Sequence, residues 1–152
     1  IARDNSGSTN STRNVTNKFD YIQLVASAVD GTVVDFGTIT SSNYNTSITD
    51  TNSPINITNT GNAALTTMSI TGANLTATGV TSIDILRFYA DDDSTVAAAQ
   101  QLNTSKQQIT GVSVAVATSA TPSTSSLWTF FNVTSTLEAA SYSGTWTLWE
   151  EQ

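Results

Sequence analysis

Alternation of apolar and polar residues is the dominant pattern along this chain. In residues 55–58 and 112–116 every second position is apolar, as in a β-strand with one buried face. Denser apolar runs lie at 19–29, 33–40, 65–70, 83–89, 127–133 and 142–149, with turn sequences such as Asp30-Gly31 between them. About eight strands at this spacing predict an all-β fold, an antiparallel β-sandwich of about seven to nine strands.

The same pattern predicts which side chains form the core and which segments connect the strands. Residues 41–53 read as a polar loop that ends at Pro54, and only residues 94–106 have helical character, which fits a short helix or an irregular crossover. Pro122 and the serines after it are expected to break the chain before the strand at 127–133. We expect these side chains in the core: Ile57, Ile85, Phe88, Val114, Trp128, Phe130 and Trp146.

The chain divides into a polar leader and one domain. Residues 1–17 are mostly Ser, Thr, Asn and Gly, with little to bury, and predict an extended arm. Residues 18–152 are of the usual size for one β-sandwich domain. Within this domain, the strand predicted at 19–29 has apolar residues on both faces and needs cover on both.

The composition predicts a surface whose polar groups are mostly uncharged. Charged residues make up 11% of the chain and apolar residues 38%, while 20 Ser and 28 Thr supply much of the rest. The net charge is −7 and there is no basic cluster to follow a phosphate backbone, so nucleic acid is not an expected partner. No apolar run approaches the length of a membrane span.

The residue types needed for most catalytic mechanisms are missing, so we expect no enzyme activity and no cofactor. Neither His nor Cys occurs, which excludes Ser-His-Asp and Cys-His catalysis and the usual zinc ligands. A carboxylate pair would have to draw on Glu138, Glu150 and Glu151, two of which end the chain. Lys18 and Lys106 lie outside any Ser-x-x-Lys context.

Two local features admit a binding role, and for each we favour a structural interpretation. Asp91-Asp92-Asp93 offers oxygen ligands to a cation such as Ca²⁺, but it lacks the alternating acids of an EF-hand and reads better as a solvated turn. Aromatic residues gather in the last quarter of the chain and are suited to stacking on sugars. Their alternation fits core positions better; they are Trp128, Phe130, Phe131, Tyr142, Trp146 and Trp149.

Seven asparagines stand in Asn-x-Ser/Thr sequons, against about four expected by chance in a chain so rich in hydroxyl residues. They are Asn10, Asn14, Asn45, Asn56, Asn74, Asn103 and Asn132. We expect most of them to carry N-linked glycan in native material, where added sugar would give solubility to a weakly charged surface.

Three stretches resemble the strands of prokaryotic surface Ig-like domains. Val34-Asp35-Phe36-Gly37-Thr38-Ile39 and Ile55-Asn56-Ile57-Thr58-Asn59-Thr60-Gly61-Asn62-Ala63-Ala64-Leu65 are similar to their opening strands. Ala140-Ser141-Tyr142-Ser143-Gly144-Thr145-Trp146-Thr147-Leu148 is similar to their closing strand. Among such domains the chain most resembles archaeal extracellular filament subunits, the glycosylated threads and the related camelysin-like (TasA-like) fibre proteins. The resemblance implies an Ig-like β-sandwich pilin with an N-terminal arm.

In filaments of this kind an extended segment of one subunit completes the sandwich of the next by strand addition. The residues placed for that role are Phe19, Tyr21, Ile22, Leu24 and Val25. The alternative is that residues 19–29 form the first strand of their own sandwich, with the arm confined to the leader.

The leading expectation is therefore an extracellular, cell-surface structural protein that polymerises with copies of itself. Ile1 at the start in place of Met suggests a removed signal peptide, which fits this location. Two other functions stay open. One is an adhesive or carbohydrate-binding module, and the other is an S-layer or virion-surface domain.

Overall fold

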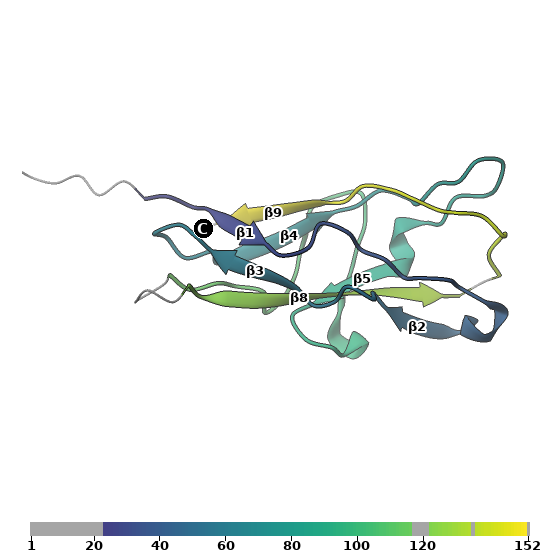
Figure 1. The fold of residues 1–152 in the computed structure, drawn as a ribbon, viewed down its shortest axis with the longest axis horizontal. Coiled ribbons are helices and arrows are strands. Elements are labelled where there is room, and N and C mark those ends of the chain that lie inside the picture. The colour runs from purple at the N-terminus through teal and green to yellow at the C-terminus, as the bar shows by residue number, and fades with distance from the viewer. Residues whose placement is uncertain (1–22, 117–121, 135, 152) are drawn as a thin grey trace, which may run out of the picture.

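Nine antiparallel strands and three single turns of 3-10 helix form the regular structure of the residues that the computed structural model describes, which are 23–116, 122–134 and 136–151. The strands are β1 (Ser27–Val29), β2 (Thr46–Thr49), β3 (Ile55–Asn59), β4 (Thr67–Thr71), β5 (Phe88–Asp91), β6 (Gln100–Gln101), β7 (Gln107–Gln108), β8 (Thr124–Val133) and β9 (Thr147–Glu151). The turns are η1 (Ser41–Asn43), η2 (Ile85–Arg87) and η3 (Val96–Ala98). The strands lie in two layers and make an all-β sandwich, which confirms the predicted fold class (Figure 1).

The ten-residue strand β8 organises the larger sheet. β5 pairs with one edge of β8, and β6 follows β5. The other edge of β8 is shared: β3 pairs with its first half and β2 with its second half. β1 extends the sheet beyond β3. Because β2 and β3 occupy one edge in succession, residues 50–54 between them form a break in what would otherwise be one long strand.

The smaller sheet has β4 at its centre, with β7 on one side and β9 on the other. An isolated bridge between Leu65 and Val114 continues it, with backbone hydrogen bonds of 2.8 and 2.9 Å. Alternate burial is most regular in β3, where Ile55, Ile57 and Asn59 are buried.

The core lies between the two layers. Phe88 and Phe131 stack there with ring centroids 4.6 Å apart, and Trp146 meets Phe88 edge-on at 5.2 Å. Four of the predicted core residues belong to this cluster: Ile57, Ile85, Phe88 and Val114. Trp146 packs against its margin and is partly buried.

Trp128 and Phe130 were expected in the same core, and for Trp128 this is wrong. The residues of β8 that point between the layers are Leu127, Phe131 and Val133, so Trp128 and Phe130 point to the opposite face. Phe130 is buried there, between Tyr89 and Thr49 on the flanking strands. Trp128 is only partly buried.

Several predicted element boundaries also differ from the structure. Residues 33–40 form no strand, residues 41–53 contain η1 and β2, and β8 begins within the serine run after Pro122 that was expected to break the chain. At 83–89 only Phe88 and Tyr89 are in a strand, because η2 precedes them. Residues 94–106 contain the single turn η3 and the short β6, which matches an irregular crossover. Of residues 112–116 only Val114 makes a bridge.

Candidate functional site

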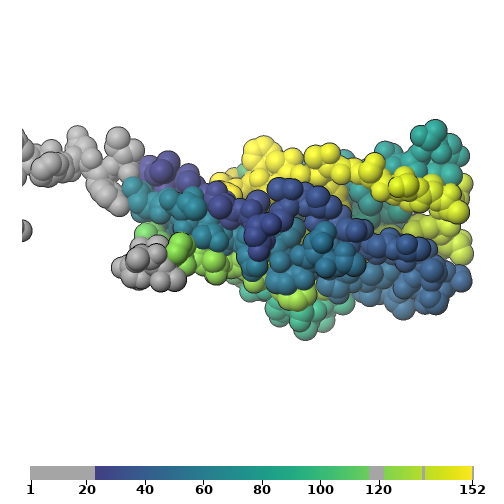
Figure 2. Space-filling model, viewed as in Figure 1, coloured from purple at the N-terminus to yellow at the C-terminus, as the bar shows by residue number. Residues whose placement is uncertain are grey.

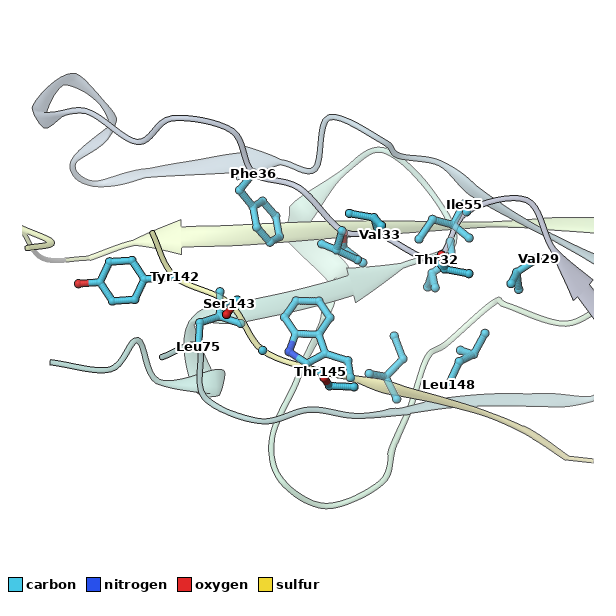
Figure 3. A pocket seen from close by; sticks show the side chains of 17 residues that line it. Val29, Thr32, Val33, Phe36, Ile55, Leu75, Tyr142, Ser143, Thr145 and Leu148 are labelled. Carbon is cyan, nitrogen blue, oxygen red and sulfur yellow. The ribbon is translucent and has the colours of Figure 1, made fainter. Parts of the chain in front are cut away.

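An apolar groove lies on an open side of the sandwich, between the edges of the two sheets (Figure 3). One wall is the edge segment, which we define as residues 31–36, preceded by Val29. The other wall is residues 142–148, which lead into β9. Core side chains such as Ile70 and Leu127 line it between the walls, and its volume is about 550 Å³. The two walls lie near one another on one face of the molecule, in dark blue and yellow (Figure 2).

Both sheets have an unpaired strand edge at this groove. Within the described chain β1 pairs only with β3, and β9 pairs only with β4. Ser27 of β1 donates a side-chain hydrogen bond to Glu150 of β9, which joins the two layers across the open side. Free backbone N–H and C=O groups beside an apolar hollow are the two features that an added β-strand needs.

The edge segment is attached to the break between β2 and β3 and not to a strand. The N–H of Asp35 donates to Oδ1 of Asp50 at 2.8 Å, and the N–H of Thr51 donates to the carbonyl of Asp35 at 2.8 Å. The side chain of Asn52 donates to the carbonyl of Val33 at 3.0 Å. Because its neighbour is irregular, the edge segment cannot form a ladder, and this explains why the strand predicted at 33–40 is absent.

Asp50 holds this arrangement together from a buried position. Its Oδ1 accepts hydrogen bonds from the N–H groups of Asp35 and Asn52, and its Oδ2 accepts from the hydroxyls of Ser53 and Thr129. The N–H of Asp50 also donates to the carbonyl of Thr129 at 3.0 Å. One carboxylate therefore connects the edge segment, the break and the centre of β8. Sequence reasoning placed Asp50 in a polar loop and missed this role.

The second wall lies close to residues 73–76, which follow β4. Ser143 and Thr76 exchange backbone hydrogen bonds at 2.8 and 2.9 Å. A Cβ on Gly144 would stand 2.7 Å from Leu75 Cδ2, so only glycine fits there without displacing that neighbour. Trp146 is oriented by a hydrogen bond from its indole N–H to the carbonyl of Ala73 at 3.4 Å. These contacts place the apolar rings of Tyr142 and Trp146 in the lining of the groove.

The residues predicted as a donor strand lie at the start of the described chain or before it. Phe19, Tyr21 and Ile22 fall outside the described residues. Leu24 is 55% exposed and Val25 is 36% exposed. The next residues form β1 on the β3 of the same chain.

The backbone of this segment follows the turn after β3. The N–H of Asn62 donates to the carbonyl of Leu24 at 3.0 Å, and the N–H groups of Thr60 and Gly61 donate to the carbonyl of Ala26 at 3.0 and 3.1 Å. A Cβ on Gly61 would stand 2.2 Å from the carbonyl oxygen of Leu24. The part of the predicted strand that is described thus pairs within its own sandwich.

Five sequon asparagines fall in the described chain, and none of them lines the groove. Asn56 lies in β3 and Asn132 in β8, whereas Asn45, Asn74 and Asn103 lie between strands. Asn10 and Asn14 are outside the described residues.

The acidic run at the end of β5 is not assembled as a cation site. Within the described chain no group of three or more Asp, Glu, His or Cys side chains is arranged to hold a metal ion. Asp91 is 5% exposed and its Oδ2 has no hydrogen-bond partner among the described residues, while Asp93 turns to Thr95. Burial raises the pKa of Asp91 above the ordinary 3.8, and the neighbouring acids add to the rise.

We predict that Asp91→Asn makes the domain more stable at pH 7. A pKa that is higher in the folded state than in the unfolded state means that the protonated carboxyl favours folding below about pH 3.8, and that this contribution is lost as pH rises through the folded pKa. The amide introduced by Asp91→Asn carries no charge at any pH, so the variant does not lose stability as pH rises. Its melting temperature should therefore exceed that of the wild type at pH 7, and the difference should shrink toward pH 3. Thermal unfolding of both proteins across this range checks it. An equal difference at every pH would contradict it.

The remaining carboxylates and the lysine of the described chain are each engaged with different partners. Hydrogen bonds from the side chain of Thr81 and from its N–H, the latter at 3.0 Å, lower the pKa of Glu138. Lys106 forms an ion pair with Glu151. Lys18 is outside the described residues. In the described chain Glu138 bonds to Thr81, Glu150 to Ser27 and Glu151 to Lys106, so these hydrogen bonds do not bring the three carboxylates together as a pair.

Among the C-terminal aromatics Trp149 is the one left on the surface, 44% exposed on the outer face of the smaller sheet. Its indole N–H donates to Thr71 Oγ1 at 2.8 Å, and Lys106 Nζ lies 4.8 Å from its ring centroid. Phe131, Tyr142 and Trp146 belong to the core or pack against it. The interpretation of these three as packing residues is thereby confirmed.

Comparison with protein-family models and with curated proteins gave no match for this chain. Among the described residues, no helix has the length and hydropathy that crossing a bilayer requires.

Proposed function

We propose that this protein is a structural subunit of an extracellular filament, in which an extended segment of one copy occupies the apolar groove of the next. The groove carries the proposal, because it combines an apolar lining with unpaired edges of β1 and β9. An inserted strand would hydrogen-bond to one or both edges and bury its apolar face against Ile70 and Leu127. Such a contact joins two different surfaces, so it continues from copy to copy as a fibre.

The N-terminal segment supplies the occupant. Phe19, Tyr21 and Ile22 are apolar residues just before the described chain, and the leader before them, residues 1–17, is mostly polar. The 22 residues before Gln23 would reach about 70 Å if fully extended, more than enough to enter a neighbouring copy. For Leu24 and Val25 to take part, the bonds between this segment and the turn after β3 would have to be exchanged.

Surface chemistry supports an extracellular location and N-glycosylation. The five described sequons leave the groove free, so glycans on them would not block an entering strand. A surface with few charges gains solubility from added sugar.

A charge placed in the groove should abolish assembly. Val33 lines the groove and is 61% exposed, so Val33→Glu should fold normally while setting a carboxylate where an apolar strand must pack. We expect full-length protein to form fibres, and the Val33→Glu protein to stay monomeric at the same concentration. Negative-stain microscopy and sedimentation measure this.

The matched control is Val96→Glu, which adds the same charge at a 38% exposed valine in η3, away from the groove. This protein should assemble like wild type. Deletion of residues 1–22 should also prevent assembly, and fibres from that truncated chain would show that the N-terminal segment is not the donor. Wild-type fibres from Val33→Glu would reject the groove, and monomeric wild-type protein at high concentration would reject the filament.

A carbohydrate-binding module is the second candidate, and Trp149 is the observation that favours it. An exposed indole held in one orientation by Thr71 and Lys106 offers a flat apolar surface to a sugar ring. Quenching of tryptophan fluorescence by added oligosaccharide, lost in Trp149→Ala, would favour this function over the filament.

A further inference from the structure

The five described sequons differ in what surrounds the acceptor nitrogen. We propose that in the folded domain Asn45, Asn74 and Asn103 accept N-linked glycan, whereas Asn56 and Asn132 are excluded by the strand ladders that contain them. This inference rests on the proposed glycosylation of the protein and specifies where it occurs.

The reaction sets the geometric demand. The asparagine Nδ2 attacks the anomeric carbon of a glycan carried on a lipid phosphate. The C–N bond forms as the bond from that carbon to the phosphate oxygen breaks, the lipid phosphate leaves with the electron pair, and Nδ2 loses one proton. An enzyme must therefore enclose both the carboxamide and the hydroxyl residue two positions later. A strand paired on both sides has to leave its sheet to be enclosed in this way.

Asn56 is the most tightly held of the five. β3 is paired with β1 on one side and β8 on the other. The Asn56 Nδ2 donates to Asp30 Oδ2 at 2.7 Å, and its Oδ1 accepts from Ser126 Oγ at 3.3 Å. The bonds from Asn56 also lower the pKa of Asp30, so this carboxylate stays charged and keeps its hold on the acceptor nitrogen. Glycosylation here would require both the ladder and the Asp30 bond to open.

Asn132 is enclosed by the ladder itself. Its Cα partner on β2 is Ser47, and on the other edge of β8 the pairing with β5 reaches the adjacent residue, Phe131. Its side chain is partly buried on the outer face of this sheet. The hydroxyl residue Thr134 lies beyond the end of the strand, but Asn132 cannot leave without separating β8 from its neighbours.

The other three sequons require less of the fold to open. Ser47 of the Asn45 sequon lies in the edge strand β2, which pairs only with β8 among the described residues, and Leu75 and Thr76 of the Asn74 sequon make only isolated bridges. Asn45 is exposed in a left-handed conformation, φ 59°, just before β2. Asn74 is exposed, and its Oδ1 accepts from the N–H of Ile85 at 2.9 Å, which leaves Nδ2 as the free end of the carboxamide. Asn103 Oδ1 accepts from the N–H of Ser105 at 2.6 Å. That turn brings the carboxamide toward the hydroxyl residue of its own sequon.

The test compares the folded chain with short peptides that carry each sequon. Bacterially made full-length protein without glycan and the five peptides are incubated with an oligosaccharyltransferase and a lipid-linked glycan, and occupancy is measured by glycopeptide mass spectrometry. We expect each loop sequon to react within a few-fold of its peptide, and Asn56 and Asn132 to react at least about tenfold more slowly than theirs, because the ladder must first open.

Modification of Asn56 and Asn132 in the folded chain at the rate of their peptides would overturn the inference. It would also fail if those two peptides were themselves as slow as the folded chain, because the ladder would then not be the cause. Asp30→Ala serves as a second variant: with the β3 ladder intact it should raise the rate at Asn56 by only a few-fold and leave Asn132 unchanged. Native protein that lacks glycan would reject the proposed glycosylation, whereas this assay tests the geometry independently of it.

Discussion

Replacing Phe88 by alanine is expected to destabilise the domain by about 3–5 kcal/mol, as for other buried Phe→Ala changes. Phe88 is fully buried, stacks on Phe131 and meets Phe36 and Trp146 at 5.5 and 5.2 Å. These contacts come from the larger sheet, the edge segment and the second wall of the groove. Loss of the ring leaves a cavity where all three meet. Urea unfolding followed by intrinsic fluorescence measures the change.

The control for Phe88 is a neighbouring apolar residue that is not in the core. Leu86 is 48% exposed in η2, so Leu86→Ala should change stability by less than about 0.5 kcal/mol. Phe88→Leu, which keeps most of the volume, should fall between the two. A loss below about 1 kcal/mol in Phe88→Ala would show that the packing between the layers is not what holds the fold.

Replacing Asp50 by alanine should cost about 3 kcal/mol, because buried donors lose a charged acceptor. Four groups donate to this carboxylate, and one of them, the hydroxyl of Thr129, joins the break to β8. The hydroxyl of Ser53, which also donates to Asp50, accepts from the N–H of Thr129 at 3.2 Å. The N–H of Asp35 loses its partner as well, which should release the edge segment from its place. The variant is therefore expected both to melt earlier and to show faster amide exchange at residues 33–36.

The Asp50→Asn variant removes the charge of this side chain but keeps its size, so it separates the two contributions to stability. Its Oδ1 keeps the bonds from Asp35 and Asn52, and its amide can donate to hydroxyls that are able to turn, so we expect a smaller loss than for alanine. The second control is Asp93→Ala: this exposed carboxylate accepts from the N–H and the hydroxyl of Thr95, and its removal should cost much less than the removal of Asp50. Equal losses for Asp50→Ala and Asp93→Ala would contradict the proposed role of Asp50.

The alternation of apolar and polar residues predicted a strand correctly where that strand buries only one face. Ile55 and Ile57 alternate with polar residues, and β3 begins at Ile55, where the pattern predicts, and ends one residue beyond it, at Asn59. β8 was found from its apolar residues, but its faces were assigned wrongly: with apolar residues at 127, 128, 130, 131 and 133, both parities look buried. Only the second layer decides that Leu127 and Phe131 point to it, while Phe130 is covered on the other side.

Charge and residue type supported expectations about function that needed no structure. The absence of His and Cys excludes whole classes of catalysis through chemistry alone, and the missing basic cluster argues against nucleic acid. Sequons can also be identified from the sequence, but the burial and hydrogen bonding of each asparagine cannot. Asn56 and Asn74 have the same motif, and only the fold shows that one is bonded to Asp30 while the other is exposed.

The groove and its support were decided by tertiary structure. Residues 33–40 have strand-like composition, but a strand needs a regular partner, and the partner here is the break at residues 50–54. Asp50 gathers donors from Asp35, 15 residues before it, and from Thr129, 79 residues after it. The hydrophobic pattern of a segment reflects only residues close together in the sequence, so it cannot predict contacts of this kind. The sequence by itself therefore determined the β class, while pairing between distant segments determined which edges stay open.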